Sequence, residues 1–196
     1  MLSIISRTFS VNWFTAPIMT VATLSASAAD QSIDTGTYTE PLSATNGDTL
    51  TLTGNIIIDA KWESHSSAIS MDDARLIGSL DTLLINLGGA SKYGIELNNK
   101  SSAEFSGSVT VSSHEGLSDT MESLLIADSR AAFQGPVSIN TIGEYNIPVE
   151  VLAGEVTFNN KLDIVTGGQR SYGILTMSIG GISNTYLNGP NNNHNE

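Results

Sequence analysis

The chain has 196 residues, a net charge of −12 from 20 acidic and 8 basic residues, and no cysteine. This length allows one domain with a sizeable core. The acidity argues against nucleic-acid binding, because no basic stripe is present to displace counterions from phosphate, and a secreted chain without cysteine must be stable without disulfides.

The first segment has the pattern of a secretory signal. Residues 1–29 contain no acidic residue and one basic residue, Arg7, and a mostly apolar run over 13–24 precedes the small-x-small signature at 26–28. We therefore interpret residues 1–28 as a signal peptide. A buried N-terminal helix or a short membrane anchor is the alternative, although the run is too short to span a bilayer. No other segment is apolar enough to span a membrane, so the mature chain is expected to have no membrane-spanning segment.

Residues 29–47 are polar and rich in turn residues. We expect them to form an N-terminal cap over the open end of the coils that follow, because the terminal unit of a stacked fold must face water.

Residues 48–190 carry five copies of one nine-residue pattern, in which inward-type residues alternate and the third of them is Gly or Asn. The copies span residues 50–58, 74–82, 103–111, 131–139 and 156–164. Aligned on their second positions, Leu52, Leu76, Phe105, Phe133 and Phe158, they are spaced by 24, 29, 28 and 25 residues. A period of this size is typical of a solenoid.

Each copy predicts two short strands that meet at a corner, where the Gly or Asn accepts a sharp bend. A second apolar patch follows in every coil, over residues 68–71, 93–97, 124–127, 149–152 and 172–177, and a polar or Gly turn closes it. Three strands and three turns per coil predict an all-β fold, a right-handed parallel β-helix of about five coils. Like residues should then stack in columns, with Phe105, Phe133 and Phe158 in one aromatic column.

The extra residues that vary the period fall just after the second strand of each coil. Insertions at one phase of a solenoid project from one face, often the binding face. Four residues of these loops are the binding-site candidates: Trp62, His65, His114 and Tyr145. Exposed aromatic residues there could contact sugars or proteins, or each ring could fold back over its own coil.

No motif for catalysis or metal binding is present. Gly-x-Ser-x-Gly is absent, and residues 116–119 form only a partial match that we interpret as a turn. His65 and His114, with Glu63 and Glu115, could form a metal site, but they lie two coils apart and their spacing does not pre-arrange ligands. We interpret the histidines as solvated, and we expect no catalytic residue, metal or cofactor.

Carboxylates near the second patch leave a carbohydrate-active enzyme as the alternative. Such enzymes need carboxylates that converge on one face, and Asp72, Asp73, Glu96 and Asp128 are the candidates. Asn and Gly stand at equivalent positions in other coils, which favours a turn role.

Residues 185–190 restart the repeat, but the next inward position is Asn191. We therefore expect an incomplete β-helix, a disordered tail over residues 191–196, and a chain that is a fragment.

A signal sequence, a short polar cap and Gly-punctuated coils rich in Ser, Thr and Asn, such as residues 131–139, resemble the start of an autotransporter passenger domain of type V secretion. The resemblance implies export through the inner membrane by a protein whose C-terminal outer-membrane β-barrel is missing from this chain. It implies a place at the cell surface or outside the cell for the full-length protein, and the periplasm otherwise. Because no catalytic motif is present, we expect a non-enzymatic function, as an adhesion module that contacts a host-surface protein or glycan, or as a stalk. A polysaccharide lyase or glycosidase is the alternative.

Overall fold

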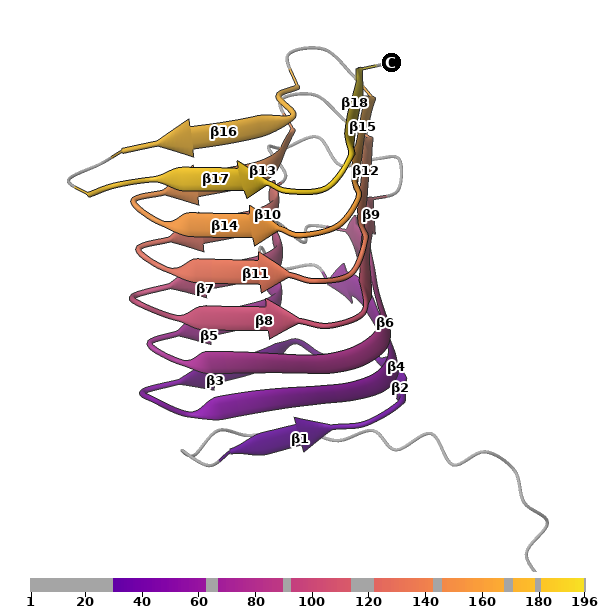
Figure 1. The fold of residues 1–196 in the computed structure, drawn as a ribbon. Coiled ribbons are helices and arrows are strands. Elements are labelled where there is room, and N and C mark those ends of the chain that lie inside the picture. Colours follow the sequence, from indigo (N-terminus) through magenta and orange to yellow (C-terminus); the bar gives the residue numbers. More distant parts are fainter. Residues whose placement is uncertain are drawn as a thin grey trace, which may run out of the picture.

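The structure is a computed structural model that describes residues 30–62, 67–89, 93–113, 122–142, 146–167, 171–178 and 181–195. These residues form strands and no helix, and every strand pairs with its neighbours in parallel (Figure 1). The coils stack from the N-terminal to the C-terminal end in a right-handed winding (Figure 1). The prediction of a parallel β-helix is confirmed.

Each coil contributes two strands, or one long bent strand, to one sheet and a third strand to the other. The first sheet contains β4 (Thr49–Trp62), β6 (Arg75–Gly89), β8 (Ser102–Phe105), β9 (Ser108–Ser113), β11 (Arg130–Phe133), β12 (Val137–Ile142), β14 (Glu155–Phe158) and β15 (Leu162–Gly167). The second sheet contains β5 (Ser67–Asp72), β7 (Tyr93–Asn98), β10 (Glu122–Ala127), β13 (Ile147–Leu152) and β16 (Ile174–Met177). The second apolar patches therefore form the second sheet, as predicted.

The core is a set of columns in which like residues stack from coil to coil. Phe133 pairs with Phe105 on one side and with Phe158 on the other. The rings are stacked, with centroids 4.8 Å and 5.1 Å apart and planes within 9° of parallel. All three are buried, so the predicted aromatic column is confirmed.

The second coil has a different register from the predicted one. Gly78, not Leu76, pairs with Leu52 and Phe105. A Cβ on Gly78 would lie 2.8 Å from the Phe105 ring, so the missing side chain makes room for that ring. A register shift after Gly54 then places Leu83 and Ile85 inside and leaves Thr82, expected to point inward, exposed.

The corner glycines serve close packing more than an unusual bend. Of the glycines that we expected at the corners, Gly54 has a positive φ of 73°, whereas Gly107 and Gly135 do not. A Cβ on Gly135 would lie 2.2 Å from the carbonyl oxygen of Gly107 in the neighbouring coil. The corners at Gly107 and Gly135 thus pack directly on the backbone of the preceding coil, and a side chain there would prevent that contact.

Both ends of the stack are formed by strands that pair with the neighbouring coil. Residues predicted as a polar cap form a rung of their own, with β1 (Gln31–Ile33) and β2 (Gly36–Tyr38) paired to β4, and β3 (Leu42–Thr45) paired to β5. At the other end, β17 (Asn184–Leu187) pairs with β14, and β18 (Asn191–Asn195) pairs with β15. Residues 191–195 were expected to be disordered; they form a strand because the open edge of β15 offers backbone donors and acceptors whatever the side chains are. The predicted signal peptide lies outside the described residues.

Candidate functional site

The residues predicted to form a binding face fall largely outside the described part of the chain. Trp62 is the last residue of β4, and its side chain is not among those described. His65, His114 and Tyr145 lie outside the described residues. The assignment of a binding role to these four residues therefore stays a prediction. The strands before and after the connections that vary in length do end and begin at one edge of the solenoid, as the repeat pattern predicts (Figure 1).

Three of the four carboxylates considered for catalysis, Asp72, Asp73 and Asp128, lie at or next to the turns between the second and first sheets. Asp73 and Asp128 have φ angles of 49° and 46°, and Asn99, at the same phase of the coil between them, has 53°. Asp and Asn tolerate this left-handed conformation better than most residues do. Asp72 also accepts a hydrogen bond from the side-chain amide of Asn99. These observations support the turn role.

Glu96 is likewise engaged within the second sheet. It accepts hydrogen bonds from the Ser67 hydroxyl and, at 2.8 Å, from the side-chain amide of Asn98. Ser67 belongs to β5, whereas Asn98 belongs to β7 like Glu96 itself, so the bond with Ser67 links adjacent coils.

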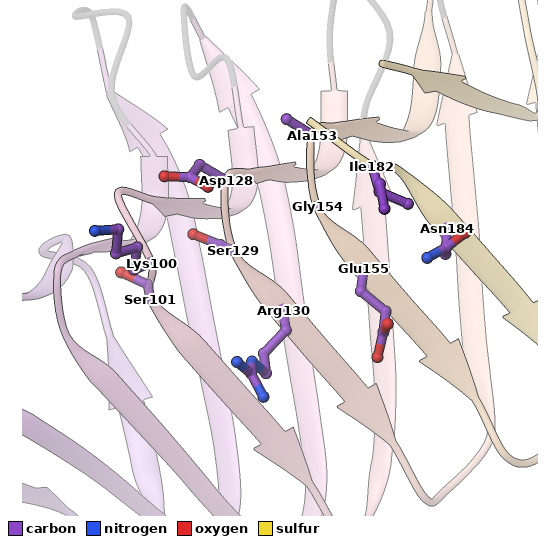
Figure 2. A pocket seen from close by; sticks show the side chains of 10 residues that line it. All are labelled: Lys100, Ser101, Asp128, Ser129, Arg130, Ala153, Gly154, Glu155, Ile182 and Asn184. Carbon is purple, nitrogen blue, oxygen red and sulfur yellow. The ribbon is translucent and has the colours of Figure 1, made fainter. Parts of the chain in front are cut away.

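Two hollows adjoin each other: the larger lies at the turns that lead from the second sheet into the first, and the smaller lies on the outer face of the first sheet. Asp128, considered above for catalysis, lines the larger one. The larger, of about 440 Å³, has Lys100, Asp128, Ser129, Arg130 and Glu155 among its lining residues (Figure 2). The smaller, of about 260 Å³, contains Arg75 and Glu104 and shares Arg130 and Glu155 with the larger. We call the two together the furrow.

Strand register builds the furrow. Arg75 pairs with Ser102, Ser102 with Arg130, and Arg130 with Glu155, so these residues form one polar column across β6, β8, β11 and β14. The column is outward because the next residue of each strand is a core residue, such as Ala131. Figure 2 shows Arg130 and Glu155 extending from adjacent strands on the same side of the sheet.

The larger hollow also contains a polar atom without a partner. The hydroxyl oxygen of Ser129 is buried and makes no hydrogen bond, and only 7% of the residue is exposed. Its counterpart in the previous coil, Ser101, is satisfied: it accepts from the Ala74 backbone N–H at 3.1 Å and donates to the Asn98 carbonyl at 2.6 Å. Ser129 makes neither of these contacts. This is unusual, because buried hydroxyl groups in proteins are normally hydrogen-bonded.

The sequence could have predicted that Arg75 and Arg130 lie together, but only with the correct register of the second coil. With Leu76 aligned on Phe105, Arg75 falls beside Glu104 and away from Arg130. The observed register moves Arg75 by two positions and brings both arginines into one column.

Among the residues that the structure describes, no three His, Cys, Asp or Glu side chains gather closely enough to hold a metal ion. Across the same ranges there is no helix with the length and apolar character needed to cross a membrane. The chain matches no protein-family model, no curated protein sequence and no solved structure. The fold therefore defines the class of this protein, a parallel β-solenoid, and its function must be argued from its own residues.

Proposed function

We propose that this chain is the β-helical part of an exported passenger of the autotransporter type, which acts by binding at the cell surface. The observation that supports this most is the regular parallel β-helix whose variable connections all leave from one edge. Such a scaffold holds a row of loops on rigid strands, which is how solenoids present extended binding surfaces. The expected partner is a host-surface protein or glycan.

The positions of the carboxylates favour binding over polysaccharide cleavage. Asp73 and Asp128 adopt left-handed backbone angles in turns, and Glu96 is hydrogen-bonded to the neighbouring coil. Cleavage of a glycosidic bond requires two carboxyl groups that face a substrate from defined distances. Groups already committed to turns and coil contacts are poorly placed for that task.

The binding role is tested with the purified mature chain, beginning at Ala29, on cultured epithelial cells and on immobilised glycans. Saturable binding is expected, and the variant Trp62→Ala with Tyr145→Ala should weaken it while the far-UV circular dichroism stays unchanged. Absence of binding to every cell type and glycan would favour a stalk. Release of reducing or unsaturated sugar ends from polysaccharides, lost in Asp72→Asn with Asp73→Asn, would instead support the enzyme.

The export role is tested separately. The full chain, expressed in a Gram-negative host, should appear in the periplasm with Ala29 as its first residue, because cleavage follows a small-x-small signature. Mass spectrometry of the periplasmic fraction measures this. A cytoplasmic product that retains residues 1–28 would contradict the export proposal and leave the binding role open.

A further inference from the structure

We propose that the furrow is a binding site for a carboxylated oligosaccharide. The inference rests on the proposed binding role and names its ligand class. It places the site on the first sheet and on the turns that lead into it, away from the edge at which the variable connections leave.

The first argument is the distribution of positive charge. The chain has 20 acidic and 8 basic residues, yet Arg75, Lys100 and Arg130 all line this furrow. None of the three forms an ion pair within the described part of the chain, whereas Lys161, outside the furrow, lies 2.5 Å from Asp163. Three uncommitted cations in an acidic protein form a local site for a negatively charged group, and the guanidinium fork suits a carboxylate in particular.

The second argument is the presence of acceptors beside these cations. Asp128, Glu104 and Glu155 line the same two hollows, and carboxylates accept hydrogen bonds from sugar hydroxyl groups. They also repel a dense polyanion such as a nucleic acid or a heavily sulfated chain, because like charges close together are unfavourable. The ligand that suits this mixture has many hydroxyl groups and a few carboxylates.

The third argument is geometric. Arg75 and Arg130 occupy the same column with Ser102 between them, so they lie two coils apart, about 10 Å at the usual strand spacing. An extended sugar chain rises by close to one coil spacing per residue. A saccharide with a carboxylate on every second sugar therefore places one carboxylate near each arginine when it runs along the solenoid axis.

The unpartnered hydroxyl of Ser129 is the fourth observation. It lies in the wall of the larger hollow between Lys100 and Arg130, buried and without a hydrogen bond (Figure 2). A buried hydroxyl without a partner is unfavourable, because it has lost its hydrogen bonds with water and gained none in return. The oxygen is closed off from solvent in this conformation, so a ligand hydroxyl group would supply the missing partner only after the Ser129 side chain rotates toward the hollow.

The test uses the full mature chain and isothermal titration calorimetry with a hyaluronan tetrasaccharide, which carries a carboxylate on alternate sugars. The matched probe is the same tetrasaccharide with its carboxylates reduced to alcohols. We expect saturable binding of the first probe that weakens as salt is raised, and little binding of the second. Arg130→Gln should weaken binding about tenfold or more, equivalent to about 1.4 kcal/mol, and Arg75→Gln should weaken it by a smaller factor.

Lys161→Gln is the control variant, because it also removes one positive charge but lies outside the furrow and in an ion pair. It should leave binding unchanged. Each variant is first compared with the parent chain by circular dichroism and thermal melting, and Arg130→Lys replaces Arg130→Gln where the latter loses its fold; Lys keeps the charge and loses the fork, so partial binding is expected.

Three results would overturn the proposal: equal binding of the reduced probe, equal loss in Lys161→Gln and Arg130→Gln, or tighter binding of a heparin fragment than of the tetrasaccharide. The same preparation is applied to cultured cells. A chain that binds cells but not the tetrasaccharide contradicts the furrow alone, whereas a chain that binds neither contradicts the proposed binding role as well.

Discussion

Phe133 and Leu187 occupy the same column of the solenoid, since Phe133 pairs with Phe158 and Phe158 with Leu187. Phe133 is fully buried, whereas 40% of Leu187 is exposed. Tyr186 and Ile182, in the same last rung, are exposed by 45% and 78%. An equivalent position in the repeat therefore does not ensure burial. A coil stacked on each side is needed, because each unit of a solenoid contacts only its neighbours.

The last rung also lacks charge. No Asp, Glu, Lys or Arg occurs between residues 171 and 195, in a chain whose net charge is −12. Edge strands in soluble proteins are commonly protected by charged residues. The two regions thus differ in packing and in surface character, and the following predictions separate these differences.

The largest expected effect is in the aromatic column. Phe133→Ala should lower the free energy of unfolding by about 3–5 kcal/mol, because the ring is buried between two others and leaves a cavity. Leu187→Ala, in the same column, should cost less than about 1 kcal/mol because the side chain has no coil above it. Urea denaturation measures both; similar losses for the two variants would contradict the inference that stacking causes the burial.

A smaller effect is expected at the corner. Gly135→Ala should cost about 1–3 kcal/mol, as overpacking does, because the new Cβ would lie 2.2 Å from the Gly107 carbonyl oxygen. Gly167→Ala is the control: apart from its neighbours in the chain, no described residue has an atom closer than 3.8 Å to its Cβ, and its φ is not positive. That variant should be neutral or stabilising by about 0.4–1 kcal/mol. Thermal melts of the two variants compare a corner packed on its neighbour with an open position at the end of β15. Equal melting temperatures would contradict the close-packing account.

The interior hydroxyl groups allow a finer comparison. Thr141 is fully buried and its hydroxyl has no partner, whereas the Ser113 hydroxyl accepts from the Ile142 backbone N–H at 2.8 Å. Thr141→Val should therefore leave stability unchanged or raise it by about 1 kcal/mol, and Ser113→Ala should lower it by about 1 kcal/mol. Urea midpoints decide this, and a loss in Thr141→Val as large as that in Ser113→Ala would show that Thr141 has a partner in solution.

The smallest effect is expected in the first rung. Burial, and to a lesser degree the charge of Asp34, raise the pKa of Tyr38 above 10.0, and its hydroxyl donates to the Asp34 carbonyl at 2.7 Å. As pH rises, Tyr38 therefore loses its hydroxyl proton in the unfolded chain before it does so in the folded chain. The contribution of Tyr38 to folding stability is complete below its pKa in the unfolded chain and is lost as pH rises through its pKa in the folded chain. Melting temperatures measured on both sides of pH 10 should fall slightly more for the parent chain than for Tyr38→Phe. An equal fall in the two proteins would show that Tyr38 does not contribute to the pH dependence.

The repeat period, and the alternation of inward-type and polar residues within each repeat, were sufficient to predict the coils, the second sheet and the column of Phe105, Phe133 and Phe158. These features depend on local pattern, which is read directly along the chain. The register of the second coil was not predictable. The column that contains Leu52 and Phe105 has Gly78 in this coil, and Leu76, two residues earlier, looks like the large apolar residue expected there. Only pairing with Leu52 and Phe105 distinguishes the two alignments.

The sequence by itself determined a stacked all-β solenoid, because a repeated inward face can be buried only against copies of itself. Only the tertiary structure decided which outward residues share a column, and therefore that Arg75 and Arg130 line one furrow. It also decided that β18 pairs at the end of the stack and that Gly135 contacts the coil beside it. Outward columns and close backbone contacts depend on the exact register between coils, and an outward side chain, unlike a core residue, carries no packing signal that fixes the register in advance.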